Sequence, residues 1–169
     1  MESKTALKNQ GFTLIELLVS LLVISILVSL GYANFRKYAQ KQALWAVARQ
    51  IEGDLRLAQS YAMSGKDASC SSGYLYGYQL IKVDNSSYKI QRVCRNPDGG
   101  SLTFNDVPPV RYISTGFEIY NNFPPVLFRS VVGGVDSATS INIRRSSTTS
   151  PYIVITVSLT GTISLSYNE

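Results

Sequence analysis

The chain contains no histidine and only two cysteines, Cys70 and Cys94, among its 169 residues. The missing histidine excludes Ser-His-Asp and Cys-His catalysis and every histidine-ligated zinc site. Two cysteines cannot form a four-thiolate metal centre, and their spacing is not that of a CxxC redox pair. We therefore expect a protein that is not an enzyme, with no catalytic residue, no metal site and no cofactor.

Charge is also scarce, at 16% of residues, while 45% are hydrophobic and the formal net charge is +5. The apolar residues are concentrated near the N-terminus, where the run from Phe12 to Leu30 contains a single charge, Glu16. As a helix this run would be about 28 Å long, close to the hydrocarbon thickness of a bilayer. The sequence therefore predicts a transmembrane helix over 12–35, followed by one soluble domain.

The carboxylate of Glu16 is unusual inside an apolar run. A charged side chain within a membrane helix costs at least ~2.5 kcal/mol at mid-depth, so it usually marks a function. The run is too long for a secretory signal peptide, and residues 31–36 make a poor signal-peptidase site. A plain signal anchor is the simpler alternative.

The residues from Gly11 to Val19, Gly-Phe-Thr-Leu-Ile-Glu-Leu-Leu-Val, resemble the class III leader of type IV pilins and type II secretion pseudopilins. The resemblance implies a leader over 1–11, cleavage between Gly11 and Phe12, and N-methylation of Phe12. It also implies that Glu16 acts in assembly, paired with the free amine of Phe12 on a neighbouring subunit. Such a pair would satisfy a carboxylate in an apolar setting.

The same resemblance implies partners and a location. The partners are a prepilin peptidase, an inner-membrane assembly platform, other pilin subunits, and membrane lipid before assembly. The chain would cross the cytoplasmic membrane once, with its globular domain outside the cytoplasm, and then enter an extracellular or periplasmic filament. The lysines and arginines on the two sides of the apolar run do not by themselves favour this orientation.

A second helical pattern follows the apolar run. Gly65 can end a helix, and no proline precedes it, so we expect one helix over 13–64. Its amphipathic half, the stem over 36–66, should lie across a sheet. The stem has one apolar stripe on a 3.6-residue period, made of Leu44, Ala48, Ile51, Leu55, Ala58 and Ala62.

Residues 67–169 read as a β-rich globular domain, because runs of strand formers alternate with turns. The expected fold is α+β, a long N-terminal helix packed on an antiparallel sheet, and the resemblance implies a pilin fold. Pro108 and Pro109 are expected to precede a strand. The predicted strands are 74–83, 88–95, 110–114, 117–120, 126–131, 140–144, 152–158 and 162–167.

Within the family, residues 53–62 and the closing stretch 155–165 resemble GspH/FimT-type minor pilins, with Gln59 in place of the usual arginine. The function implied is a structural subunit of a type IV pilus or a type II secretion pseudopilus. The alternative is a binding module at a pilus tip, for DNA or a surface. Some FimT-like proteins bind DNA through a Gly-Arg-x-Arg element, but here residues 161–164 contain no arginine.

Tyrosines recur in the first two strands at Tyr74, Tyr76, Tyr78 and Tyr88. The period of two in the first strand predicts that its tyrosines share one face. They could form a stacking surface for sugar or single-stranded nucleic acid, but we favour a half-buried sheet face. The basic residues of the strand region are read as a scattered solvated face, which makes a nucleic-acid partner the weaker hypothesis. They are Lys82, Lys89, Arg92, Arg95, Arg111, Arg129, Arg144 and Arg145.

Cys70 and Cys94 flank the first predicted hairpin. If the domain lies outside the cytoplasm, they can be oxidised. Closing a loop of about 25 residues would stabilise the fold by roughly 3.5 kcal/mol in the chain-entropy model. Two free thiols are the alternative, and we favour the structural disulfide.

Overall fold

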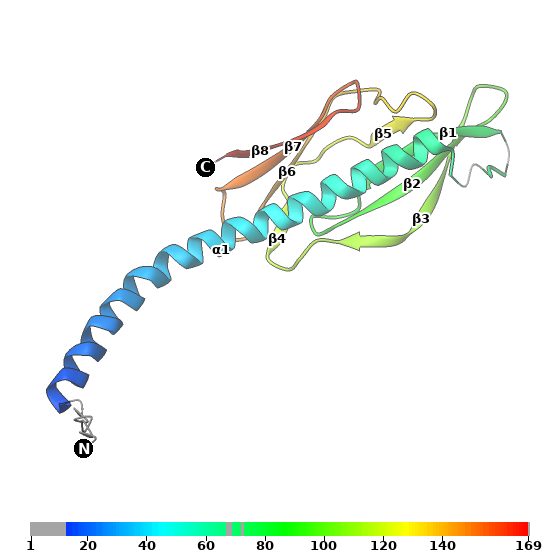
Figure 1. The fold of residues 1–169 in the computed structure, drawn as a ribbon. Coiled ribbons are helices and arrows are strands. Elements are labelled where there is room, and N and C mark those ends of the chain that lie inside the picture. The colour runs from blue at the N-terminus through cyan, green and yellow to red at the C-terminus, as the bar shows by residue number, and fades with distance from the viewer. Residues whose placement is uncertain (1–12, 67–68, 72, 169) are drawn as a thin grey trace, which may run out of the picture. The chain divides into compact units, whose positions relative to one another are not determined.

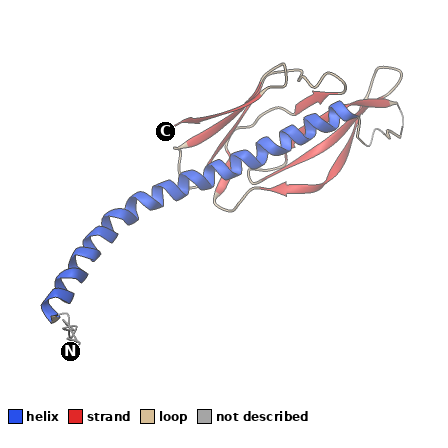
Figure 2. Cartoon of the chain, viewed as in Figure 1, coloured by secondary structure: helices blue, strands red, loops and turns tan. Residues whose placement is uncertain are grey.

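The computed structural model describes residues 13–66, 69–71 and 73–168, with the backbone alone described at 30, 31, 33 and 34. Figure 1 labels the elements along the chain, and Figure 2 separates helix from strand. In the described residues these elements are α1 (Leu14–Ser64), β1 (Tyr74–Lys82), β2 (Ser87–Arg95), β3 (Leu102–Tyr112), β4 (Phe117–Ile119), β5 (Val126–Arg129), β6 (Thr139–Arg145), β7 (Tyr152–Val157) and β8 (Ile163–Asn168).

The chain divides into two compact units, residues 1–41 and residues 42–169. Within the second unit, the last part of α1 lies across the strands (Figure 2). The apolar stripe predicted for this part of the helix is confirmed, because all six of its side chains are buried, and Val47 joins them. Burial of this stripe holds the helix in place, since a helix is stabilised mainly by packing of its apolar face.

The strands form two antiparallel sheets of four strands each. The first, sheet A, has the order β3-β2-β1-β5, and the second, sheet B, has the order β4-β6-β7-β8. Side chains from both sheets and from α1 meet in one hydrophobic core, in which Ile51, Leu80 and Ile141 are fully buried. The predicted α+β fold, a long helix packed on antiparallel β-structure, is confirmed, with the strands divided between two sheets.

The prediction that Pro108 and Pro109 precede a strand is wrong, because both lie inside β3. β3 is an edge strand of sheet A. Its pairing with β2 shifts register at this point, where Tyr88 faces Arg111 and Ile90 faces Val107. An edge strand with an irregular register can accept prolines, since their missing N–H groups need no partner there.

The prediction that the tyrosines of β1 share one face is also wrong. The β1–β2 register shifts between Leu75 and Gly77, which makes Tyr76 the inserted residue of a β-bulge. A one-residue insertion reverses the alternation of faces along the strand. Tyr74 and Tyr78 therefore lie on opposite sides of the sheet. Tyr74 is 53% exposed, whereas Tyr78 is buried in the core.

A polar network fastens α1 to sheet A beside the core. The hydroxyl of Tyr88 donates a hydrogen bond to Oδ2 of Asp54 at 2.6 Å. Nε of Arg111 lies 2.8 Å from Oδ1 of the same carboxylate, with both side chains less than one-fifth exposed. Tyr88 is fully buried, and this burial, with the Asp54 carboxylate beside it, raises the pKa of its hydroxyl far above the usual range.

Replacing Asp54 with alanine is expected to destabilise the fold by about 3 kcal/mol, because a buried hydroxyl and a guanidinium lose their shared carboxylate. Arg56→Ala is the control: its side chain is 64% exposed and pairs with Glu52 on the same helix, and loss of such a pair costs less than about 0.5 kcal/mol. Urea unfolding measures both. Equal losses in the two variants would contradict this interpretation.

The stability of the fold should also depend on pH through Tyr88. Because folding raises the pKa of the Tyr88 hydroxyl, the stability that this hydroxyl contributes is complete below about pH 10 and falls as the pH rises further.

Gln59 links α1 to a loop of each sheet. Its Nε2 donates to the carbonyl oxygen of Gly133 at 2.9 Å and to that of Gly161 at 3.1 Å. Gly133 follows β5 of sheet A, and Gly161 lies in the turn between β7 and β8 of sheet B. At Gly161 the backbone has a φ of +81°, which favours glycine. A Cβ there would collide with the Gly133 oxygen and with Nε2 of Gln59, so a side chain at this position would break the link that Gln59 makes.

Candidate functional site

The residues singled out by the sequence fall in different places. Gly11 and Phe12 lie outside the described residues, so cleavage and N-methylation stay predictions. Glu16 lies in the first turn of α1, in the unit of residues 1–41. Cys70 and Cys94 belong to the unit of residues 42–169, where they are bonded to each other.

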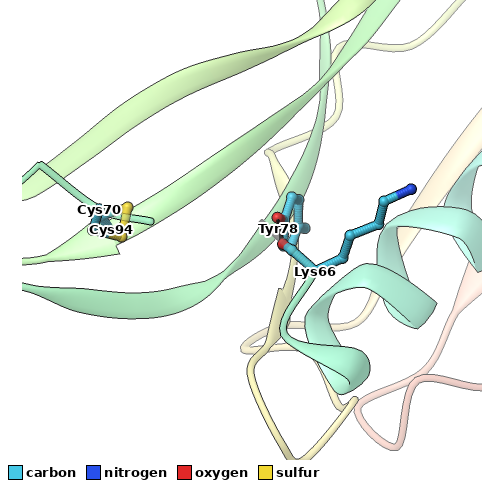
Figure 3. The surroundings of a disulfide bond; sticks show 4 residues. All are labelled: Lys66, Cys70, Tyr78 and Cys94. Atoms are coloured by element: carbon cyan, nitrogen blue, oxygen red, sulfur yellow. Dashed lines mark hydrogen bonds between the residues drawn. A yellow bond between two sulfur atoms is a disulfide. The ribbon is translucent and has the colours of Figure 1, made fainter. Parts of the chain in front are cut away.

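The disulfide ties the segment after α1 to strand β2 (Figure 3). The two Cα atoms are 5.9 Å apart, and the cysteines are 24 positions apart in the sequence. The hydroxyl of Tyr78 on β1 donates to the carbonyl oxygen of Lys66 just after α1 (Figure 3). The connection from α1 to β1 is thus held at two points, and the role of the disulfide is structural.

Thr13 caps the start of α1. Its Oγ1 accepts a hydrogen bond from the backbone N–H of Glu16 at 3.3 Å, and its carbonyl oxygen accepts one from Leu17. Thr13-x-x-Glu16 is the pattern of a capping box, and an acid in the first turn also interacts well with the positive end of the helix dipole. This role of Thr13 was not among the predictions, although the spacing of Thr13 and Glu16 alone indicates it.

The helix surface after Glu16 is apolar on all sides. The large apolar side chains from Leu14 to Val28 are each between 48% and 83% exposed within this structure. They are Leu14, Ile15, Leu17, Leu18, Val19, Leu21, Leu22, Val23, Ile24, Ile26, Leu27 and Val28. A helix without a polar face needs an apolar environment around it.

The serines in this segment add little polarity to its surface. The hydroxyl of Ser20 donates to the carbonyl oxygen of Glu16, that of Ser25 to Leu22, and that of Ser29 to Ile26. Each hydroxyl hydrogen is thus bonded within the helix itself. The segment can therefore enter an apolar environment without leaving these donors unpaired, and Glu16 is its one charged group among the described side chains.

Within the described residues, we find no helix that has both the length and the apolar character needed to cross a membrane.

Aromatic and basic side chains alternate directly after the apolar segment. Tyr32, Phe35 and Tyr38 are each more than 60% exposed, and the guanidinium of Arg36 lies 5.9 Å from the centre of the Tyr32 ring. Amphipathic rings and long basic side chains of this kind are typical of a boundary between an apolar and an aqueous phase. This group was not predicted from the sequence, although the alternation of aromatic and basic residues after the apolar run is a signal for it.

Several basic side chains of the strand region are paired with acids. Besides Arg111 with Asp54, the structure pairs Lys89 with Asp106, Arg129 with Asp136 and Arg144 with Glu118. The charge that could attract a phosphate backbone is correspondingly reduced. Among the described residues, no group of three acidic or thiol side chains is placed to hold a metal ion.

The apolar segment and its capped start coincide with a known motif. Residues 7–32 match the prokaryotic N-terminal methylation motif. The chain carries a class III methylation leader. This motif is consistent with the type IV pilin and pseudopilin family, and a long helix packed on antiparallel sheets is a pilin-like fold. No curated protein and no solved structure matches the chain.

Proposed function

We propose that this chain is a pilin-like structural subunit, cut by a prepilin peptidase and assembled into a filament of a type IV pilus or a type II secretion pseudopilus. The observation that carries the proposal is the helix segment Leu14 to Val28, which exposes apolar side chains on every face directly after a methylation leader. Such a surface has to be covered, first by lipid and then by the same segment of other subunits.

The proposal places residues 12–35 in the cytoplasmic membrane before assembly. The exposed rings of Tyr32 and Tyr38 would then lie at the headgroup level, with Arg36 beside them. The globular unit would lie outside the cytoplasm, where its disulfide is stable. In the filament the protein has no enzymatic role, and its globular unit forms the outer surface.

Glu16 would act when lipid is exchanged for protein. An ionised carboxylate in a filament core requires a positive partner, and the amine of Phe12 in an adjacent subunit is created only by cleavage. The cap from Thr13 holds Glu16 in the first turn of α1, which supports a role for this carboxylate at the start of the helix. The features shared with GspH/FimT-type minor pilins support a minor subunit within this class.

Intact-mass spectrometry of the protein from the cell surface fraction tests the processing step. We expect a chain that begins at Phe12 and carries one added methyl group. Gly11→Val should abolish the cut, because the larger side chain stands next to the scissile bond, and the precursor should stay in the membrane. Gly11→Ala, which adds a single methyl group, is the matched control and should still be cut. A surface protein that retains residues 1–11, or normal cutting of Gly11→Val, would overturn the proposal.

A further inference from the structure

A groove lies along strands β1, β2 and β3 of sheet A, beside the loop between β4 and β5. It has a volume of about 370 Å³, which is within the range of small-molecule sites, about 300–1,000 Å³. The floor comes from adjacent strands, because Gln79 of β1 pairs with Gln91 of β2. The loop between β4 and β5 contributes further lining residues. The side chains that line the groove belong to Gln79, Ile81, Lys82, Gln91, Phe104, Asn122, Phe123 and Pro125.

The amides on the floor are fixed in orientation. Gln79 is 93% buried, and its Nε2 donates to Oε1 of Gln91 at 2.8 Å. Gln91 in turn donates to Oδ1 of Asp106 at 2.7 Å, and Lys89 holds the other oxygen of that carboxylate at 2.9 Å. An amide has two donor hydrogens and an acceptor oxygen, so one bond leaves Gln79 able to engage a hydroxyl group as donor and as acceptor.

The groove presents no uncommitted charge. Its lining includes no acid, and its one cation, Lys82, donates from Nζ to the carbonyl oxygens of Ile119 and Asn121 at 3.0 and 3.2 Å. A phosphate or carboxylate ligand would need cations that are free to pair with it. The lining thus suits a neutral ligand that is rich in hydroxyl groups.

An exposed aromatic ring from β3 also lines the groove. Phe104 of β3 is 52% exposed, although it lines the groove together with the buried Phe123. The face of an aromatic ring is negative, and it attracts the weakly positive C–H groups on one face of a pyranose ring. An exposed ring beside fixed amides therefore combines stacking with hydrogen bonding, which are the two contacts that a sugar offers.

We propose that this groove binds a neutral hexose oligosaccharide, with one ring stacked on Phe104 and its hydroxyl groups bonded to Gln79, Gln91 and Asn122. The inference is independent of the leader and of filament assembly, because all lining residues belong to the unit of residues 42–169. It would give a filament that contains this subunit the ability to adhere to a glycan.

The test uses the full chain purified in lauryldimethylamine oxide, a detergent without a sugar headgroup. Chitotriose and cellotriose are titrated separately by calorimetry, and a proline-rich decapeptide serves as the competing ligand class. We expect at least one trisaccharide to bind with a dissociation constant of about 1 mM or tighter. Binding of chitotriose alone identifies N-acetylated glycans, and binding of cellotriose identifies the hexose backbone as sufficient.

Two exposed residues report the site without disturbing the core. Phe104→Ala and Asn122→Ala should each weaken trisaccharide binding by about ten-fold or more. Tyr112→Ala is the matched control, because Tyr112 is an aromatic residue of the same strand that is 70% exposed and does not line the groove; its affinity should equal that of the wild type. The proposal is overturned if neither trisaccharide binds, if only the peptide binds, or if both groove variants bind as the wild type does.

Discussion

Filaments should incorporate Glu16→Val at less than about one-tenth of the wild-type level, while the variant chain is cut and methylated normally. If the proposed pair forms, the variant would leave the Phe12 amine of a neighbouring subunit without its carboxylate in an apolar core, which costs several kcal/mol, and each 1.4 kcal/mol is a factor of ten. Folding should be unaffected, because the buried core lies within residues 42–169. Immunoblots of sheared filaments against the membrane pool give the ratio.

Two further variants separate the charge of Glu16 from its place in the capped helix start. Glu16→Gln keeps a side chain that suits a capping box but removes the charge, so it should assemble as poorly as Glu16→Val. Thr13→Ala removes the observed capping bond, which is worth about 1 kcal/mol, and keeps the carboxylate. It should assemble much better than either. Normal assembly of Glu16→Gln would show that the contribution of Glu16 is local capping and not pairing between subunits.

The second large effect concerns the disulfide. Cys70→Ser opens a loop whose ends are 24 positions apart, and the chain-entropy model gives a loss of about 3.5 kcal/mol. For a chain of this size we expect the melting temperature to fall by about 10 °C. Thermal unfolding followed by circular dichroism measures the change.

Two controls accompany the cysteine variant. Wild-type protein treated with a reducing agent should melt at the temperature of Cys70→Ser, and the reducing agent should not lower the melting temperature of the variant further. Protein taken from the cell envelope should contain no thiol that reacts with an alkylating reagent under non-reducing conditions. Two reactive thiols in that protein would reject the disulfide in the cell.

The parts of the fold that the sequence predicts well depend on neighbours in the chain. The stem was recognised because Leu44, Ile51 and Leu55 recur on a helical period, and all are buried as expected. The hairpin of β1 and β2 was placed by its polar turn, where Asp84 accepts hydrogen bonds from Ser86 and Ser87. Those bonds lower the pKa of the Asp84 carboxyl to about 2. Since they join residues of the turn to one another, the turn can be predicted from neighbouring residues alone.

The errors arise where distant strands decide the outcome. The bulge at Tyr76 depends on how β1 pairs with β2, and the period of the tyrosines contains no sign of it. The prolines of β3 are tolerated because the strand is at an edge, which is a property of the sheet and not of residues 102–112. The groove on sheet A likewise needs Phe104 and Asn122 to be brought together by strands that the sequence alone could not order.

In the proposed filament, the two hydrogen bonds of Gln59 would have a mechanical consequence when a subunit is under tension. A pull transmitted along α1 within residues 42–169 reaches the loop after β5 and the β7–β8 turn through the same amide. Part of the load would therefore reach sheet A and sheet B at the same time, in addition to what the buried stripe of α1 transmits to the shared core.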